Sequence, residues 1–318
     1  MVSKKKRFTK KNLIQKLQPT PLISVEKLTK NYGKFRAVSN LSFSVREGEI
    51  FGLIGPNGAG KSTTMRSMLN FIFPTKGSIS IDGYDSKIDY LKIRSLIGYL
   101  PGEFTTYENM TGIQYLTHVL NLRKKPDKIP YAKSLAKKFD LDLDKKTSQL
   151  SKGNKQKIGI IQAFAHDPEI IILDEPTSGL DPLKQQEFDE LVLERKAAGK
   201  TIFISSHVLP EVEMLCDRVA IIKEGRIVAE NTMSELKSMA MNRFEVSFKG
   251  EVKEKSFGKS IGVQKISNVG EKYIFDISGD VNKFIRKISE HKVEIFRSME
   301  PDLEEIFLSF YQKKKGKR

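Results

Sequence analysis

The feature that most constrains this chain is a glycine-rich loop at residues 55–62, with the order Gly-Pro-Asn-Gly-Ala-Gly-Lys-Ser. The loop follows the short apolar run Ile50–Ile54, which is typical of a buried strand, and helix-favouring sequence starts at Lys61. Glycines let the backbone curl until its N–H groups point at phosphate oxygens, and a helix that begins there adds the positive end of its dipole. A strand, such a loop and a helix together predict a phosphate-binding site at the edge of an α/β sheet.

The side chains of this loop narrow the ligand to a nucleotide with Mg²⁺. At this spacing the Lys61 ammonium reaches the β- and γ-phosphates, and the Ser62 hydroxyl is a ligand of Mg²⁺. The alternative is an ordinary glycine-rich turn, which would need neither the strand before it nor the helix after it. The predicted ATP-binding residues of the loop are Gly55, Pro56, Asn57, Gly58, Ala59, Gly60, Lys61, Ser62 and Thr63.

A pair of carboxylates ends a second apolar run. Residues 170–173 are Ile-Ile-Ile-Leu, and Asp174 and Glu175 follow directly. A buried strand carries Asp174 to the end of the sheet where the phosphate loop lies, and there it can hold Mg²⁺ directly or through water. Glu175 is then positioned to polarise an attacking water molecule. Alone, the two acids could form a solvated turn, but together with the loop at Lys61 they predict a nucleotide-hydrolysing site.

Strands and helices alternate along most of the chain. Residues 22–54 are typical of strands, residues 111–166 look mostly helical, and strands and helices alternate again from 170 to 222. This order predicts an α/β fold with a mostly parallel sheet and helices on its faces. A new alternating pattern from residue 242 predicts a small α/β appendage. The predicted divisions are a basic tail at 1–20, a nucleotide-binding domain at 21–240 with a helical subdomain at about 103–166, an accessory α/β domain at 241–312 and a basic tail at 313–318.

The net charge of +16 is concentrated in the two tails. Residues 1–20 carry seven basic side chains and residues 313–318 carry five, with no acid in either segment, so residues 21–312 have a net charge of only +4. Such tails either are simply solvated or attract anionic lipid, at about 1 kcal/mol per basic residue near the surface. A nucleic-acid groove would need basic charge organised on the folded body.

The composition favours a globular protein without a membrane span of its own. The hydrophobic fraction is 39% and the charged fraction 30%. No apolar stretch approaches the roughly 18 residues that a spanning helix needs, and none follows Lys4–Arg7 that could serve as a signal peptide. We therefore expect a chain that neither spans a membrane nor enters the secretory route by itself. Its single cysteine, Cys216, fits a reducing cytosol, and we expect it to be a small buried apolar residue.

Four further segments occur in a fixed order around the two nucleotide motifs. They are Tyr32, upstream of the first strand hairpin, Leu-Ser-Lys-Gly-Asn-Lys-Gln at 150–156, Ser-Gly-Leu-Asp at 178–181, and His207 after two serines. In this order they resemble the nucleotide-binding subunits of ATP-binding cassette transporters over roughly residues 22–240. The counterparts in that family are an aromatic ring stacked on adenine, the signature segment, the segment that couples two active sites and the switch histidine.

The resemblance implies a P-loop NTPase in which the mostly parallel sheet is joined by an antiparallel β subdomain and a helical subdomain. Two copies, identical or paralogous, would sandwich two ATP molecules, with the Lys61 loop of one copy facing the signature segment of the other. Residues 151–153 open a predicted helix, so their N–H groups can meet a γ-phosphate, and Ser151 can also cap that helix. The trans-ATP signature residues are Ser151, Lys152, Gly153 and Asn154, and the dimer-coupling residue is Asp181.

By the same resemblance the chain is an ATPase that powers an exporter through a separate transmembrane permease. ATP would close the dimer, closure would move the permease, and hydrolysis would reopen the dimer. The catalytic residues would be Glu175 and His207, and Ser62 and Asp174 would hold Mg²⁺. The motif variants are most similar to the subgroup that pairs with exporters of drugs, antibiotics, peptides or polysaccharides, which places the chain at the cytoplasmic face of the cell membrane.

The chain departs from the family pattern in two places. Lys152 stands where the family usually has Gly, and Asn154 where it has Gln, although the phosphate-facing pair Ser151 and Gly153 is retained. Gly102 stands where the family places a Gln that senses Mg²⁺ and relays motion to the membrane partner. A glycine offers no side-chain ligand, and the neighbouring Glu103 is the candidate substitute. The segment 105–111 and the helices after it would receive the partner's coupling helix.

Two other functions remain open. A ribosome- or nucleic-acid-associated ATPase of the same superfamily would suit the basic tails, but such ribosome factors resemble two fused cassettes, and this chain has one motif set. Alternatively, residues 242–318 sense a ligand and gate the ATPase, or they merely stabilise the structure or the dimer. Of the four histidines, only His207 has motif support, and we expect His118, His166 and His291 to be surface or packing residues.

Overall fold

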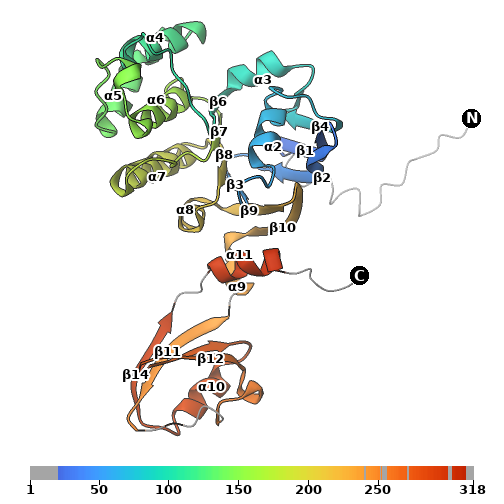
Figure 1. Ribbon diagram of the computed structural model, residues 1–318, viewed down its shortest axis with the longest axis vertical. Helices are drawn as coiled ribbons and strands as arrows, with labels where there is room; N and C mark the ends of the chain where they lie inside the picture. Colours follow the sequence, from blue (N-terminus) through green and yellow to red (C-terminus); the bar gives the residue numbers. More distant parts are fainter. Residues whose placement is uncertain are drawn as a thin grey trace, which may run out of the picture. The chain divides into compact units, whose positions relative to one another are not determined.

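The computed structural model describes residues 21–239, 241–250, 252, 256–270, 272–299 and 303–312, and the two predicted basic tails lie outside these ranges. The chain divides into two compact units, Met1–Glu230 and Asn231–Arg318. This division falls ten residues before the boundary predicted at 240. Each unit has a sheet and an apolar core of its own (Figure 1).

A six-stranded sheet in the order β10-β9-β3-β8-β7-β6 forms the centre of the first unit. Neighbouring strands from β9 to β6 run parallel, which confirms the predicted mostly parallel sheet. Strands β3, β7 and β8 are buried along their whole length. For this reason β3 and β7 are almost continuously apolar, whereas β8 has three apolar residues between Thr201 and the serines Ser205 and Ser206. The strands are β3 (Ile50–Ile54), β6 (Ile97–Leu100), β7 (Ile170–Asp174), β8 (Thr201–Ser206), β9 (Arg218–Lys223) and β10 (Arg226–Thr232).

A second, antiparallel sheet in the order β2-β1-β4-β5 shares the core of the first unit. Its strands are β1 (Ile23–Tyr32), β2 (Phe35–Val45), β4 (Lys76–Ile81) and β5 (Tyr84–Asp85). Strand β1 runs further than its apolar alternation predicts, because register shifts between Val25 and Asn31 break the period of two. The prediction for Tyr32 is corrected here: Tyr32 ends β1 and pairs with Phe35 across the hairpin turn, so it lies within the first hairpin rather than upstream of it.

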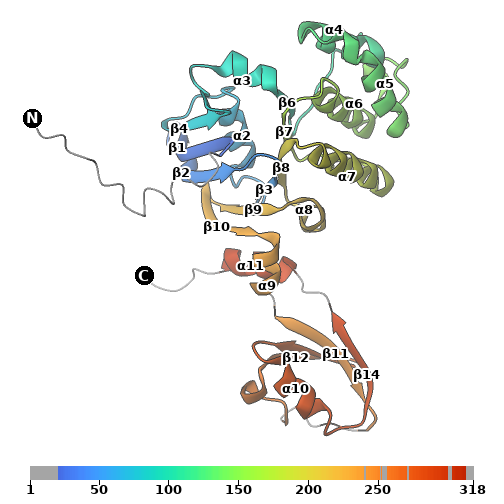
Figure 2. The ribbon, with the colours of Figure 1, turned by 180° about the vertical axis from the view of Figure 1, so that it is seen from behind.

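Helices complete the first unit on both sides of the six-stranded sheet. Figures 1 and 2 show α4, α5 and α6 grouped on one side as the predicted helical subdomain, with α2 and α3 beside the antiparallel sheet on the other. Helix α6 packs closely on β6 because Gly98 has no side chain: a Cβ there would lie 1.9 Å from the Ala163 carbonyl oxygen. The helices are α2 (Lys61–Met68), α3 (Tyr90–Leu96), α4 (Gly112–Leu122), α5 (Ile129–Lys138), α6 (Lys152–Phe164), α7 (Pro182–Ala197) and α8 (Leu209–Leu215).

The second unit is built on a four-stranded sheet in the order β12-β13-β11-β14. Helix α10 buries Phe284 and Ile288 against Phe244, Phe275 and neighbouring apolar residues of this sheet. Its elements are α9 (Met233–Met239), β11 (Asn242–Phe248), β12 (Val263–Val269), β13 (Lys272–Ile277), α10 (Val281–Ile288), β14 (Val293–Met299) and α11 (Leu303–Gln312). Within the described ranges of the chain, none of the helices is long and apolar enough to cross a membrane.

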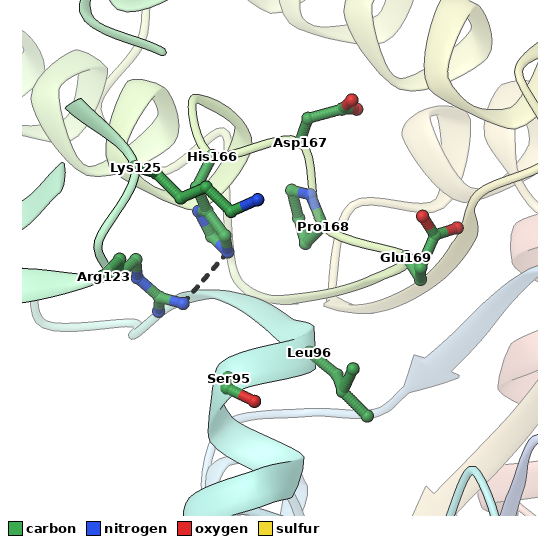
Figure 3. A pocket seen from close by; sticks show the side chains of 8 residues that line it. All are labelled: Ser95, Leu96, Arg123, Lys125, His166, Asp167, Pro168 and Glu169. Atoms are coloured by element: carbon green, nitrogen blue, oxygen red, sulfur yellow. Dashed lines mark hydrogen bonds between the residues drawn. The ribbon is translucent and has the colours of Figure 1, made fainter. Parts of the chain in front are cut away.

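His166 is buried at the wall of a pocket beside α3. The pocket is lined by Ser95 and Leu96 at the end of α3, by Arg123 and Lys125 after α4, and by residues 166–169 before β7 (Figure 3). Arg123 Nη1 lies 3.0 Å from His166 Nε2, and because a guanidinium only donates hydrogen bonds, this ring nitrogen is the acceptor. His166 is therefore a neutral packing residue, as the sequence predicts.

The acid stability of the first unit should depend on His166. Burial first, and then the positive charge of Arg123, lowers the pKa of His166 from 6.5 to about 4. Because the unfolded chain binds the proton first, the free energy of unfolding should fall by about 3 kcal/mol between pH 6.5 and about 4. His166→Gln keeps an acceptor for Arg123 but cannot titrate, so urea unfolding should show a smaller acid loss in this variant. The control His118→Gln, which leaves the Arg123 contact intact, should keep the loss.

Candidate functional site

The predicted catalytic side chains gather at one edge of the six-stranded sheet. Strands β3, β8 and β7 are parallel neighbours, so the loops after their carboxyl ends lie side by side. The loop after β3 leads to Lys61, β7 ends at Asp174 with Glu175 next, and β8 ends one residue before His207. The phosphate loop and the carboxylate pair thus lie at the same edge of the sheet.

Lys61 is the central cation of this edge. It begins α2 and is only 5% exposed, and its Nζ donates to the carbonyl oxygen of Gly55 at 2.7 Å. The same Nζ forms an ion pair with Glu175 Oε1 at 2.9 Å. The geometry of this contact is not that of a hydrogen bond. In this arrangement the ammonium is held by the phosphate loop on one side and by the carboxylate on the other.

The carboxylate of Glu175 joins Lys61 to His207. Its Oε2 lies 2.6 Å from His207 Nδ1, so the side chains form a chain from lysine through carboxylate to imidazole. The Glu175 backbone is held in the left-handed region at φ 51°, and its N–H donates to Ser205. A strained backbone at a non-glycine residue persists only where the surrounding structure imposes it. The fold therefore holds Glu175 in one position between the phosphate loop and His207.

Ser205 holds Asp174 and the Glu175 backbone in position. In the sequence it was noted only as one of the two serines before His207. It is fully buried, and its hydroxyl donates to Asp174 Oδ1 at 2.5 Å while accepting from the Glu175 N–H at 3.2 Å. This leaves Asp174 Oδ2 buried without a hydrogen-bond partner among the described residues. A buried carboxylate oxygen without a partner is costly, and it suits a metal ion or a metal-bound water.

A cavity of about 260 Å³ opens over this edge. Tyr32 and Glu175 line it, together with Phe35, which the sequence analysis did not single out. The Phe35 side chain is 65% exposed. In the sequence only its aromatic character and its place three residues after Tyr32 could have indicated this role. Of the predicted loop residues, Gly55 and Ala59 pack beneath the loop, and those that line the cavity are Pro56, Asn57, Gly58, Gly60, Lys61, Ser62 and Thr63.

The signature residues of the same copy do not reach this cavity. Ser151 caps α6 by accepting from the Asn154 N–H at 3.3 Å, and Ser151 and Lys152 are exposed. Gly153 lies against the segment after β7, because a Cβ there would be 2.6 Å from the Gly179 carbonyl oxygen. Asp181 is exposed and caps α7 by accepting from the Lys184 N–H at 3.1 Å. The structure thus separates these residues from the Lys61 cavity within one copy.

Gly102 lies beside the carboxylate pair. A Cβ at this position would be 3.2 Å from Asp174 Oδ2, which is tighter than an ordinary contact. Glu103, the candidate substitute for the missing glutamine, is exposed and does not line the cavity. The Gly102 backbone is thus the part of this segment that lies next to the unpartnered oxygen of Asp174.

Comparisons with known proteins agree with this geometry. A family model described as ABC transporter matches residues 38–178. A solved "Structure of ATP binding subunit of ABC transporter" is 33% identical, covers 69% of this chain and 92% of that one, and superposes with a TM-score of 0.64. The solved structure thus confirms the P-loop NTPase fold that the resemblance implied.

Two curated relatives cover most of the chain. The "Bacitracin transport ATP-binding protein BcrA" of Enterococcus faecalis is 35% identical over 294 residues, which cover 90% of this chain and 95% of the relative. The "Probable multidrug ABC transporter ATP-binding protein YbhF" of Escherichia coli is 34% identical over 238 residues, which cover 72% of this chain but only 41% of the relative. The chain belongs to the family of ATP-binding proteins of ATP-binding cassette (ABC) transporters.

Proposed function

We propose that this chain is the ATP-hydrolysing subunit of an ABC exporter, and that it works as a dimer on a separate transmembrane permease. The observation that carries the proposal is the chain of contacts from Lys61 through Glu175 to His207 beneath a cavity lined by the phosphate loop. The relatives named for bacitracin and multidrug transport support the direction of transport. The site of action is then the cytoplasmic face of the cell membrane.

The residues present fit ATP with Mg²⁺. Tyr32 and Phe35 supply aromatic rings at the mouth of the cavity, and the phosphate loop supplies N–H groups at its base. Ser62 and Asp174 would hold the metal, since Asp174 Oδ2 is buried without a partner and Ser62 lines the cavity. When bound, Mg²⁺ supplies neutralisation of the charge on the phosphoryl oxygens.

Lys61 and Glu175 change partners in the proposed cycle. Without nucleotide they neutralise one another. Phosphate oxygens compete for the Lys61 ammonium, and this frees Oε1 of Glu175 to accept a hydrogen bond from the attacking water. His207 keeps Oε2 in place through the 2.6 Å contact, so the carboxylate does not lose its orientation when Lys61 leaves. ATP binding thereby prepares the general base.

The signature segment is proposed to complete the site of a second copy. Ser151 and Lys152 are exposed on α6, and Ser151 begins a helix whose N–H groups and dipole favour an anion. The Lys61 cavity of the same copy lacks these residues. Two copies, identical or paralogous, would then complete each other's sites. Gly179 lies next to Gly153, and Asp181, two residues further on, begins α7 as its N-cap, so both lie in the segment where the copies would meet.

Ser151→Asp separates helix capping from phosphate binding. Aspartate caps a helix as well as serine does, so the free energy of unfolding should change by less than about 0.5 kcal/mol. Its negative charge should repel the γ-phosphate of the second copy, and the steady-state ATPase rate should fall by about 100-fold or more. Because an active site needs both copies, the wild-type specific activity should also rise with protein concentration. Undiminished turnover in Ser151→Asp would contradict the dimeric site.

The permease is proposed to dock at the segment 105–111 and on α4. Tyr107 is 59% exposed before α4, and Leu122 is 71% exposed at its end. The Tyr107 ring contacts the rings of Tyr115 and His118, and its carbonyl oxygen accepts from the Thr147 hydroxyl, so this apolar surface is held in place. Co-purification of a multi-helix membrane protein that is lost on Tyr107→Glu would test this surface.

The basic tails and the second unit leave two narrower proposals. Contact of residues 1–20 and 313–318 with anionic lipid would add to membrane attachment, and this contact should weaken as the salt concentration rises.

For residues 241–312 we favour a structural or dimer-stabilising role. The charged side chains on the sheet face opposite α10 pair with one another, as in Arg243–Asp276 and Lys272–Glu245. Salt-sensitive RNA binding that survives deletion of both tails would instead favour the nucleic-acid-associated class.

A further inference from the structure

A second cavity, of about 460 Å³, lies between α7 and α8 and is lined by acids and apolar residues. The acids are Asp189 and Glu190 on α7 and Glu211 on α8, and no lysine, arginine or histidine is among the described residues that line the cavity. The apolar part of the lining includes Leu193, Val208 and Met214, which are each about half-exposed. Glu190 pairs with Lys138 at 3.6 Å, so the inner acids Asp189 and Glu211 are the local excess of negative charge in this cavity.

The two inner acids are buried without a cationic partner. Asp189 is 9% exposed and Glu211 is 8% exposed, and Asp189 Oδ1 and Glu211 Oε1 have no hydrogen-bond partner among the described residues. Glu211 uses its other oxygen to accept from the Ser206 hydroxyl at 2.7 Å. An ionised carboxylate that is buried without a cationic partner costs several kcal/mol, so the pair must hold either protons or a cation.

Their titration agrees with this environment. Burial raises the pKa of Asp189 to about 6 and that of Glu211 to about 7. The charged groups that face Glu211 are Asp189 on α7 and Glu175 after β7, and both raise its pKa further, while the hydroxyls of Ser206 and Thr177 lower it. The Cys216 thiol, whose own pKa burial raises, also lies near Glu211 and is neutral. No base is among the groups that shift the pKa values of these two carboxylates, since Lys184 of α7 pairs with Asp140 and Glu187, and Lys196 pairs with Asp217.

The chemistry of the lining selects the kind of cation. Metal ions such as Ca²⁺ take six to eight oxygen ligands, and no group of three or more acid, histidine or cysteine side chains in the described part of the chain could hold a metal. A primary ammonium needs only a few acceptors, since it donates three hydrogen bonds. Its alkyl chain can lie on apolar side chains, as the stem of a lysine does.

We propose that the cavity between α7 and α8 binds a small aliphatic primary amine, with its ammonium between Asp189 and Glu211 and its alkyl chain against Leu193, Val208 and Met214. The site is separate from the nucleotide cavity but connected to it. Glu211 holds the Ser206 hydroxyl, which accepts from the Val208 N–H at 3.0 Å, and His207 lies between these two residues. An amine that keeps Glu211 ionised therefore also strengthens its hydrogen bond to Ser206. Ser206 is the last residue of β8, and His207 follows it.

The probe for this site is 1,4-diaminobutane, titrated into the full-length protein by calorimetry without nucleotide. At about pH 8 both acids are ionised, and saturable binding of one molecule per chain is expected in excess KCl. At about pH 5.5 the acids are mostly protonated while the amine stays charged, so the affinity should fall by at least about tenfold. Butan-1-ol, which has the alkyl chain but no charge, should not bind.

Variants locate the binding to this cavity. Asp189→Asn and Glu211→Gln keep the side-chain shape and should each lower the affinity at about pH 8 by at least about tenfold, while the control Glu190→Gln at the exposed rim should lower it less than about threefold. In the wild type, the NMR signal of an isotope-labelled Met214 methyl group should shift during the titration. This signal reports on the site even if a variant does not fold. Absence of saturable binding in wild type, an unmoved Met214 signal, or unchanged affinity in both inner variants would overturn the proposal. Since no measurement uses ATP, the result is independent of the proposed ATPase.

Discussion

Glu175→Gln should abolish ATP turnover while leaving ATP binding intact. Glutamine has the size and hydrogen-bonding reach of glutamate, and it adopts the same φ of 51° at no additional backbone cost. It cannot accept a proton from water, so the hydrolysis rate should fall by about 100-fold to 10,000-fold. Because hydrolysis reopens the dimer in the proposed cycle, the variant should accumulate as a closed, ATP-bound dimer.

The test combines single-turnover hydrolysis with size-exclusion chromatography in ATP and Mg²⁺. The matched control is Glu169→Gln, since Glu169 is an exposed acid next to the opposite end of β7 and pairs with Lys200. This control should hydrolyse ATP at the wild-type rate and remain in the wild-type monomer–dimer equilibrium. Near-normal hydrolysis by Glu175→Gln would remove Glu175 from the role of general base.

Lys61→Ala should lose most of its nucleotide affinity. The ammonium is only 5% exposed and already turned toward the phosphate loop through Gly55, so little reorganisation is needed before it meets phosphate oxygens. A hydrogen bond to a charged group contributes about 1.5–3 kcal/mol, so its loss should weaken ATP binding by about 10-fold to 100-fold. The variant also leaves Glu175 without its cation, so a modest loss of thermal stability should accompany the weaker binding.

Fluorescent-nucleotide titration with and without Mg²⁺ measures this effect. Lys200→Ala is a suitable control, because Lys200 is a largely buried lysine that pairs with Glu169 and Asp167 away from the phosphate loop. Its affinity for ATP should equal that of the wild type. An unchanged ATP affinity in Lys61→Ala would contradict the assignment of the phosphate loop, and with it the proposed function.

Local patterns predicted most of the elements but not their ends. Strands β3 and β7 were predicted because they are buried on both faces and therefore consist mostly of apolar residues, and β8 was predicted from the apolar residues 202–204 at its centre. Strands β5, β6, β10 and β12 and helices α3 and α9 were not predicted. None of the residues of β10 is buried. Its sequence therefore has too few apolar residues to show the alternation that predicts a strand.

The sequence by itself determined the phosphate loop, the carboxylate pair and the capped start of α6, because each depends on residues that are adjacent along the chain. Only the tertiary structure decided that Glu175 lies between Lys61 and His207, that Phe35 joins Tyr32 at the cavity, and that Asp189 and Glu211 share a cavity without a base. These contacts follow from the strand order β3-β8-β7 and from the packing of α7 beside α8. The order of strands in a sheet is set by burial of all their apolar faces together, and no local segment of the chain contains that information.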